Sequence, residues 1–160
     1  MGSSRPATIG AAAGHVQNAA KQFLVEMASL MGLPAGGEDA LCELASIRGY
    51  GGFMCRIQIA PDSDVVAVRP EVILPIAARE LEGADVERLL VFQRAMADEL
   101  RWIVGLSADG MLHLSPLDWI NEPQAAVAAM DLGQVLGRDA VHELVGGPEP
   151  ARDESPSQPR

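Results

Sequence analysis

The stretch 85-DVERLLVFQRAMADELRWIVGLSADGMLHLSPL-117 contains the change of hydrophobic period that decides the expected fold. Its first half places apolar residues three, four or six to seven positions apart, which is helical spacing, and Asp85 is the expected N-cap. From Trp102 onward apolar residues alternate as in a strand, and Ala108-Asp109-Gly110 is a turn signal before a second apolar strand. We therefore predict a helix followed by a β-hairpin.

The helix in this stretch is apolar on more than one side. Such a helix, followed by a hairpin that is apolar on both faces, has more surface to bury than one small domain provides. We therefore expect this unit to form both the core and a subunit interface. The apolar residues of the helix are Val86, Leu89, Leu90, Val91, Phe92, Met96 and Leu100.

Composition is that of one globular domain with an acidic surface. The chain has 160 residues, 48% of them hydrophobic, and a net charge of −10. A chain of this length buries roughly 70% of its unfolded surface. There is no basic stripe to displace phosphate counterions, so a nucleic-acid partner is not expected. The acidity favours a basic or unfolded protein partner instead.

Cysteine usage and hydropathy point to the cytoplasm. Cys42 and Cys55 form neither a metal pattern nor a disulfide framework. No signal peptide is recognised near the N-terminus, and no run of about 18 apolar residues predicts a membrane span. We expect a cytoplasmic protein.

Before the central stretch, the chain is expected to form one helix and three strands. Residues 1–15 are small and polar and are expected to be disordered. Apolar positions from Val16 onward predict a helix that Gly32 and Pro34 end. Residues 40–47 could form a strand or a helical turn. Strands are expected at 53–60, which alternates cleanly, and at 65–69.

Two segments on either side of the central helix are less regular. Pro70 and Pro75 bracket a short apolar segment, 72–74, which therefore cannot be a central strand along its whole length. Residues 76–82 could add a short helical piece before the central helix.

After the hairpin, Asn121 as N-cap and Pro123 in the first turn predict a last helix. Gly133 and Gly137 weaken it by about 1 kcal/mol each relative to alanine and could break it in two. The domain is expected to span 16–147, followed by an acidic, proline-rich, disordered tail at 148–160.

The expected fold is α+β: helix, three strands, helix, two strands, helix, with helices packed on an antiparallel sheet.

No chemical motif within it is complete. Gly105-Leu106-Ser107-Ala108-Asp109 lacks the second glycine of the hydrolase elbow. His142-Glu143 lacks the second histidine of a zinc-protease helix, and Asp62-Ser63-Asp64 lacks the later ligands of a calcium loop. Gly49-Tyr50-Gly51-Gly52 lacks the lysine of a phosphate loop. His113, Ser115 and Asp118 lie close in sequence but without an activated elbow. We predict no catalytic residue, no metal site, no cofactor and no enzymatic activity.

The order and character of these elements resemble a known family. The first helix ends in Leu30-Met31-Gly32-Leu33-Pro34, which is similar to the break that ends the first helix of class I type III secretion chaperones. The three strands, the helix at 85–100, the hairpin turning at Asp109-Gly110, the last helix, the size and the acidity agree. The acidic, proline-containing tail is more similar to the broad-range, HpaB-type chaperones of plant-pathogenic bacteria. The two glycines in the last helix and the glycine-rich loop at 49–52 depart from the pattern.

This resemblance implies an ATP-independent homodimer that binds an N-terminal segment of secreted effectors, keeps it extended and delivers it to the export ATPase. By position it implies effector binding at Phe23, Met27, Leu30, Leu33, Leu41 and Leu44. It implies a dimer interface at Leu89, Leu90, Phe92, Met96, Trp102 and Ile103. The alternatives are that these residues are core only, and that the chain is a small dimeric regulatory or interaction module without secreted clients.

Overall fold

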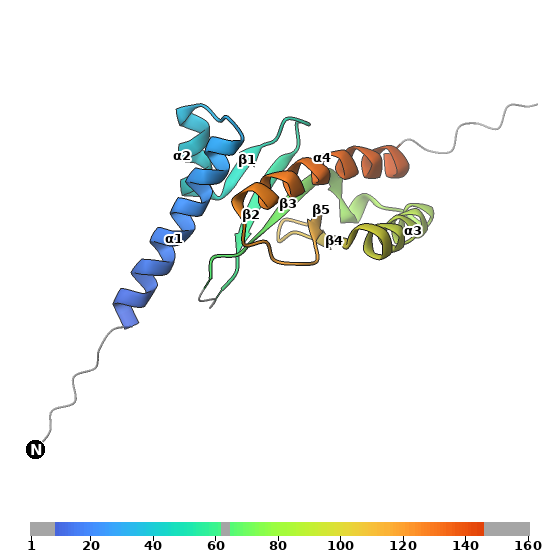
Figure 1. The fold of residues 1–160 in the computed structure, drawn as a ribbon. Coiled ribbons are helices and arrows are strands. Elements are labelled where there is room, and N and C mark those ends of the chain that lie inside the picture. The colour runs from blue at the N-terminus through green and yellow to red at the C-terminus, as the bar shows by residue number, and fades with distance from the viewer. Residues whose placement is uncertain (1–8, 62–64, 146–160) are drawn as a thin grey trace, which may run out of the picture.

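The structure, a computed structural model, describes residues 9–61 and 65–145. Within them the fold is α+β, with four α-helices and a five-stranded antiparallel sheet (Figure 1). The strands lie in the order β1-β2-β3-β5-β4. The helices are α1 (Ile9–Leu30), α2 (Ala35–Leu44), α3 (Gly83–Leu100) and α4 (Pro123–Val145), with a short 3-10 helix at Ala78–Glu80. The strands are β1 (Ser46–Arg48), β2 (Met54–Ile59), β3 (Val68–Ala77), β4 (Trp102–Leu106) and β5 (Met111–Pro116).

The N-terminal half differs from the sequence prediction in two helices and in one strand. The strand expected at 65–69 begins only at Val68 and continues to Ala77 as β3. α1 begins at Ile9 rather than near residue 16, so residues 9–15 are helical, while 1–8 lie outside the described part. Most of the segment at 40–47, which could have been strand or helix, belongs to α2. That helix starts after Pro34 and ends where Ala45 takes a left-handed conformation with φ of 47°. The expected order therefore gains a second helix before the first strand.

β3 is the central strand of the sheet, and it contains both prolines of the segment that was difficult to place. Pro70 lies opposite Ile57 of β2. The register between β3 and β5 shifts between Ile73 and Ala77, around Pro75. A proline has no N–H to donate, and a register shift is one of the few places where a sheet tolerates it. The segment 72–74 is thus part of a central strand whose pairing with β5 is interrupted.

α3 and the hairpin lie where the sequence predicts them, with one correction at the helix start. Glu82, not Asp85, is the N-cap, and the two form a capping box in which the Glu82 N–H donates to Asp85 Oδ2 over 3.0 Å. The helix ends at Arg101, whose φ of 57° turns the chain directly into β4. At the hairpin turn Gly110 has a φ of 81°, a conformation that favours glycine.

α4 is one continuous helix, so the expectation that its glycines could break it is wrong. Both glycines are buried against the sheet. A Cβ atom at Gly133 would lie 2.7 Å from Trp102 Cη2 and 2.8 Å from Val72 Cγ2. The missing side chain therefore lets α4 lie close against the sheet, and packing outweighs the low helix propensity of glycine.

The core lies between the sheet and the helices, which all pack on the same sheet face (Figure 1). One group of buried residues joins α1 and α2 to β2, the start of β3 and the start of α4. A second joins α3 and the later part of α4 to β3, β4 and β5. α4 contributes to both groups and crosses the sheet between them. The opposite sheet face carries no helix within the described residues.

Candidate functional site

The large aliphatic side chains of α3 are mostly exposed. This helix of 18 residues buries only Met96. A helix at the edge of a sheet with so little buried surface presents apolar area to a partner. The exposed aliphatic residues are Val86 at 41%, Leu90 at 62%, Val91 at 72% and Leu100 at 44%.

Four of the six residues expected at a dimer interface pack within the chain's own core. Met96 and Trp102 are each only 3% exposed. Leu89 and Phe92 are half-buried and pack against the same group. Ile103 is half-buried in β4, and only Leu90 is well exposed. α3 does expose apolar side chains that its own core does not cover. Apart from Leu90, however, these exposed residues are not the ones expected at the dimer interface.

The free surface of α3 has two flanks. On one flank, positions 86, 90, 93, 97 and 100 are spaced alternately four and three residues apart, and all of them except Gln93 are apolar. This spacing is the one with which a helix packs against a second helix. We call Val86, Leu90, Ala97 and Leu100 the α3 stripe. On the other flank, Ala84, Val91 and Ala95 face α4 across a groove. A single helix therefore offers two separate apolar surfaces.

α3 also covers part of the free edge of β4. β4 pairs with β5 on one side only. The Val104 N–H, which points away from β5, donates to Gln93 Oε1 of α3. An edge strand with open N–H groups is a template for an added strand, so α3 closes this edge at its middle. We therefore expect a protein partner to bind the exposed helix surfaces rather than to add a strand to the β4 edge.

The six residues expected to bind effectors divide into core and surface. Phe23, Met27 and Leu41 are 7%, 0% and 0% exposed and belong to the core between α1, α2 and the sheet. Leu30 is 54% exposed and Leu44 is 72% exposed. Leu33, half-buried, lies in the connection between the two helices. Leu30, Leu33 and Leu44 are the members of this set that remain available for direct contact in a free chain; we call them the α1–α2 surface.

The glycine-rich loop after β1 has a structural role. The Gly51 N–H donates to Gln134 Oε1 of α4 over 2.6 Å. A Cβ at Gly49 would lie 2.2 Å from the same oxygen. Beside them, the Tyr50 hydroxyl donates to the Met31 carbonyl over 2.5 Å. The glycines make room for a buried side chain of α4, and this contact fixes the loop between α1 and α4.

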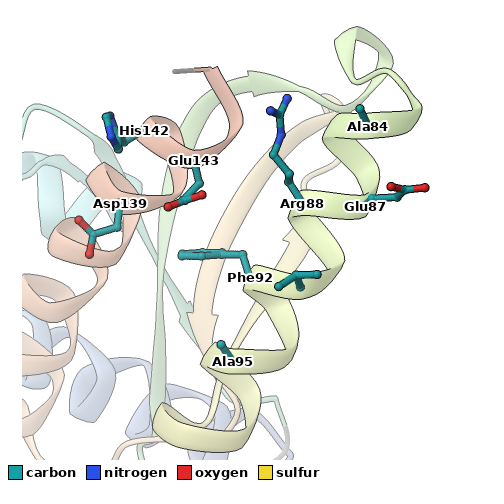
Figure 2. Close-up of a pocket in the computed structure, with 9 residues that line it drawn as sticks. Ala84, Glu87, Arg88, Phe92, Ala95, Asp139, His142 and Glu143 are labelled. Atoms are coloured by element: carbon teal, nitrogen blue, oxygen red, sulfur yellow. The ribbon is translucent and has the colours of Figure 1, made fainter. Parts of the chain in front are cut away.

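A groove of about 820 Å³ lies between α3 and the C-terminal turns of α4. Figure 2 shows Phe92 reaching from α3 toward α4, with Glu143 and Asp139 on the opposite wall. Arg88 rises beside Phe92, and its guanidinium forms an ion pair with Asp85. Of the α4 residues of this groove, His142 and Glu143 were considered from the sequence only as a zinc motif, and Asp139 was not singled out. Carboxylates four residues apart near a helix end were the available signal, since that spacing puts them on one face.

The uncovered face of the sheet carries a row of polar side chains. Arg69 Nη2 donates to Gln58 Oε1 over 2.9 Å, and Gln58 Nε2 donates to Glu71 Oε1 over 2.6 Å. His113 Nε2 lies 3.4 Å from the same carboxylate oxygen. Trp119 continues the row, with its ring centroid 4.6 Å from Arg69 Cζ. Although no helix covers this face in the described residues, Glu71 is only 6% exposed.

His113 is held neutral by this environment. Burial lowers its pKa below the ordinary value of 6.5, while Glu71 acts in the opposite direction and Arg56 and Arg69 add to the lowering. The ring lies directly over Gly105, where a Cβ would be 2.4 Å from His113 Nε2. His113 Nδ1 is buried and has no hydrogen-bond partner among the residues that the structure describes. A neutral histidine beside a buried carboxylate here is part of a structural network.

The remaining candidates from the sequence are placed apart. His113 and Ser115 lie on the uncovered face, whereas Asp118 is paired with Arg101 over 2.8 Å. The aspartates at 62 and 64 lie outside the described residues. Across 9–61 and 65–145, no three side chains of His, Cys, Asp or Glu gather as metal ligands would. None of the helices in those ranges is long and apolar enough to span a bilayer.

Comparison with known proteins returns no relative: no family model, no curated protein and no solved structure matches this chain. The functional argument therefore rests on the exposed surfaces described above.

Proposed function

We propose that this chain is a cytoplasmic chaperone of a bacterial type III secretion system. As a homodimer it binds the N-terminal segment of effector proteins, keeps that segment extended and delivers it to the export ATPase. The observation that carries the proposal is the state of α3, which buries one of its 18 residues and exposes several large aliphatic side chains. The order of elements around it, apart from the added α2, is the one that the family resemblance implies.

The α3 stripe supports the dimer. Its residues repeat with the spacing that one helix uses to pack against another, and a two-fold axis lets the same stripe meet itself. Leu90, at 62% exposure, is its most exposed member. A stable interface buries about 800 Å² per subunit. In the proposed dimer the stripe contributes this area together with neighbouring parts of α3 and the hairpin.

The α1–α2 surface supports client binding. Leu30 is exposed at the end of α1, the helix along which the resemblance places the effector, and Leu44 is exposed at the end of α2. Exposed aliphatic side chains bind an extended segment without requiring it to fold. The net charge of −10 favours segments that carry basic residues.

The proposal is tested by co-expression with candidate effectors and pull-down of their N-terminal segments. Leu30→Glu and Leu44→Glu should abolish capture, because each places a carboxylate where an apolar contact is needed. Both should leave the melting temperature nearly unchanged, since these side chains are exposed. Phe23→Glu is the control, and it should unfold the chain because Phe23 is 7% exposed. Capture that survives both surface variants would exclude the α1–α2 surface as the client site.

A second function is favoured by the uncovered sheet face. Its row of Arg69, Gln58, Glu71 and His113 is polar and ordered, which suits a folded partner more than an extended apolar segment. A small dimeric regulatory or interaction module would use that face. In the same pull-down, capture of a folded, non-secreted protein that Arg69→Ala weakens and Leu30→Glu does not would favour this second function.

A further inference from the structure

We propose that the α3–α4 groove, lined by Ala84, Glu87, Arg88, Val91, Phe92, Ala95, Asp139, His142 and Glu143, is a docking site for a basic amphipathic segment of another protein. An aliphatic side chain of that segment contacts Val91, Phe92 and Ala95, and an adjacent Lys or Arg reaches Asp139 and Glu143. This site is separate from the α1–α2 surface and from the α3 stripe. It does not depend on the proposed secretion function.

The shape and floor of the groove suit an apolar side chain. Figure 2 shows the Phe92 ring extending into the space between the two helices, with Ala95 one turn further along α3. Val91 is 72% exposed, so this wall has no partner within the described chain. The volume of 820 Å³ lies in the range of sites that bury a peptide-sized or drug-sized group. A helix or extended segment that places one aliphatic residue here would bury exposed apolar area.

The charges of the groove select a basic partner. Asp139 and Glu143 contribute two exposed carboxylates to the α4 wall, whereas the Glu87 side chain points away from α4 (Figure 2). The only Arg or Lys in the lining is Arg88, and it is engaged by Asp85. Asp139 and Glu143 lie in the last two turns of α4, where the helix dipole adds negative potential. A cation is therefore attracted to this end of the groove.

Two other occupants fit less well. The chain that follows α4 has the sequence GGPEPARDESPSQPR at 146–160, with three acidic and two basic residues and, proline apart, no aliphatic side chain larger than alanine. Its composition offers neither the aliphatic side chain nor the positive balance that the groove requires. A second copy of the chain, with its net charge of −10, would bring an acidic protein to the carboxylates of Asp139 and Glu143. A different, basic protein segment remains the matching occupant.

The probe for the test is a fluorescein-labelled Leu/Lys peptide of about 14 residues, long enough to form an amphipathic helix on binding. Its controls are a scrambled peptide of the same composition and a Leu/Glu peptide of the same pattern. Fluorescence anisotropy with the full chain should show micromolar binding of the Leu/Lys peptide but not of either control peptide. The affinity should fall as the salt concentration is raised. Equal binding of the scrambled peptide would overturn the proposal, because charge alone would then explain it.

Paired variants locate the binding. Ala95→Trp fills the groove and Glu143→Lys reverses a wall charge. Each should weaken binding of the peptide by at least about fivefold, which corresponds to about 1 kcal/mol. Ala128→Trp and Asp131→Lys make the same changes at exposed α4 positions outside the groove and should change affinity less than about twofold. All four sites are exposed, so melting curves should confirm folding.

Three further outcomes overturn the assignment. Equal weakening by groove and control variants means that the peptide binds elsewhere. A change of molecular mass by light scattering in Ala95→Trp means that the groove is a contact between copies. Binding of a synthetic 146–160 peptide that Ala95→Trp abolishes means that the chain's own C-terminal residues occupy it.

Discussion

α3 and α4 pack on the same face of one sheet, yet they do so in opposite ways. α4 buries eight residues, among them two glycines and Gln134, and contributes to both parts of the core. α3 buries Met96 alone and keeps most of its aliphatic residues exposed. Apolar residues recur at helical spacing in both sequences, so this periodicity does not explain the difference. Its cause is how closely each backbone approaches the sheet.

The contrast separates a helix that completes the fold from a helix that offers surfaces. Gly133 and Gly137 let α4 lie directly on Val72, Leu74 and Trp102. α3 lies at the edge, over β4, and contacts the core through a narrow side that includes Met96 and Phe92. Substitutions in α4 should therefore change folding, while those on the outer side of α3 should change association.

The largest effect is expected at the centre of α4. Met130→Ala removes a side chain with 0% exposure and leaves a cavity, which should cost about 2–5 kcal/mol of unfolding free energy. Val91→Ala on α3, where the side chain is 72% exposed, is the matched change and should cost less than about 0.5 kcal/mol. Urea denaturation measures both. Similar losses at the two positions would remove the contrast between the helices.

Leu90→Glu tests the outer side of α3. Light scattering should give about twice 16.9 kDa for the unchanged chain and 16.9 kDa for the variant. A carboxylate at the centre of an apolar contact should weaken the dimer by at least about 2 kcal/mol. Glu99→Gln, an exposed change on the same helix, should leave the mass at twice the monomer. A monomeric unchanged chain would exclude the stripe as a self-contact.

The glycines of α4 give a smaller and graded effect. Gly133→Ala places a Cβ 2.7 Å from Trp102 and should destabilise by about 1–2 kcal/mol, because overpacking exceeds the gain in helix propensity. Gly137→Ala meets Leu74 Cδ2 at 3.3 Å and should cost less. Thermal melts of the two variants measure the order. If Gly133→Ala stabilises the chain, close approach is not the reason that α4 carries glycine.

The smallest effect is expected on the uncovered sheet face, and it depends on pH. The pKa of His113 is lowered in the folded chain, chiefly by burial, so the unfolded state binds the proton more readily. The stabilising contribution is therefore present above pH 6.5 and is lost progressively as pH falls below it. His113→Gln should flatten this part of the stability profile. A profile unchanged by His113→Gln would contradict the assignment.

Much of the fold follows from local sequence. The helix and hairpin at 85–117, the alternating strand at 53–60 and the last helix after Pro123 all lie where their patterns predict them. Long periodic segments and turn signals such as Asp109-Gly110 act over a few residues, so they can be interpreted without neighbours. The segment at 40–47 could not be assigned, because a short apolar run fits a strand or a helix equally well.

The candidate surfaces needed the tertiary structure. Phe23 and Leu30 lie seven residues apart in one apolar pattern, yet one is 7% and the other 54% exposed. Met96 and Leu90 on α3 divide in the same way, and the α3–α4 groove joins residues about 50 positions apart. The sequence determines which residues are apolar and how often they recur. Whether such a residue is core or surface depends on what packs over it, and that is decided only when the helices meet the sheet.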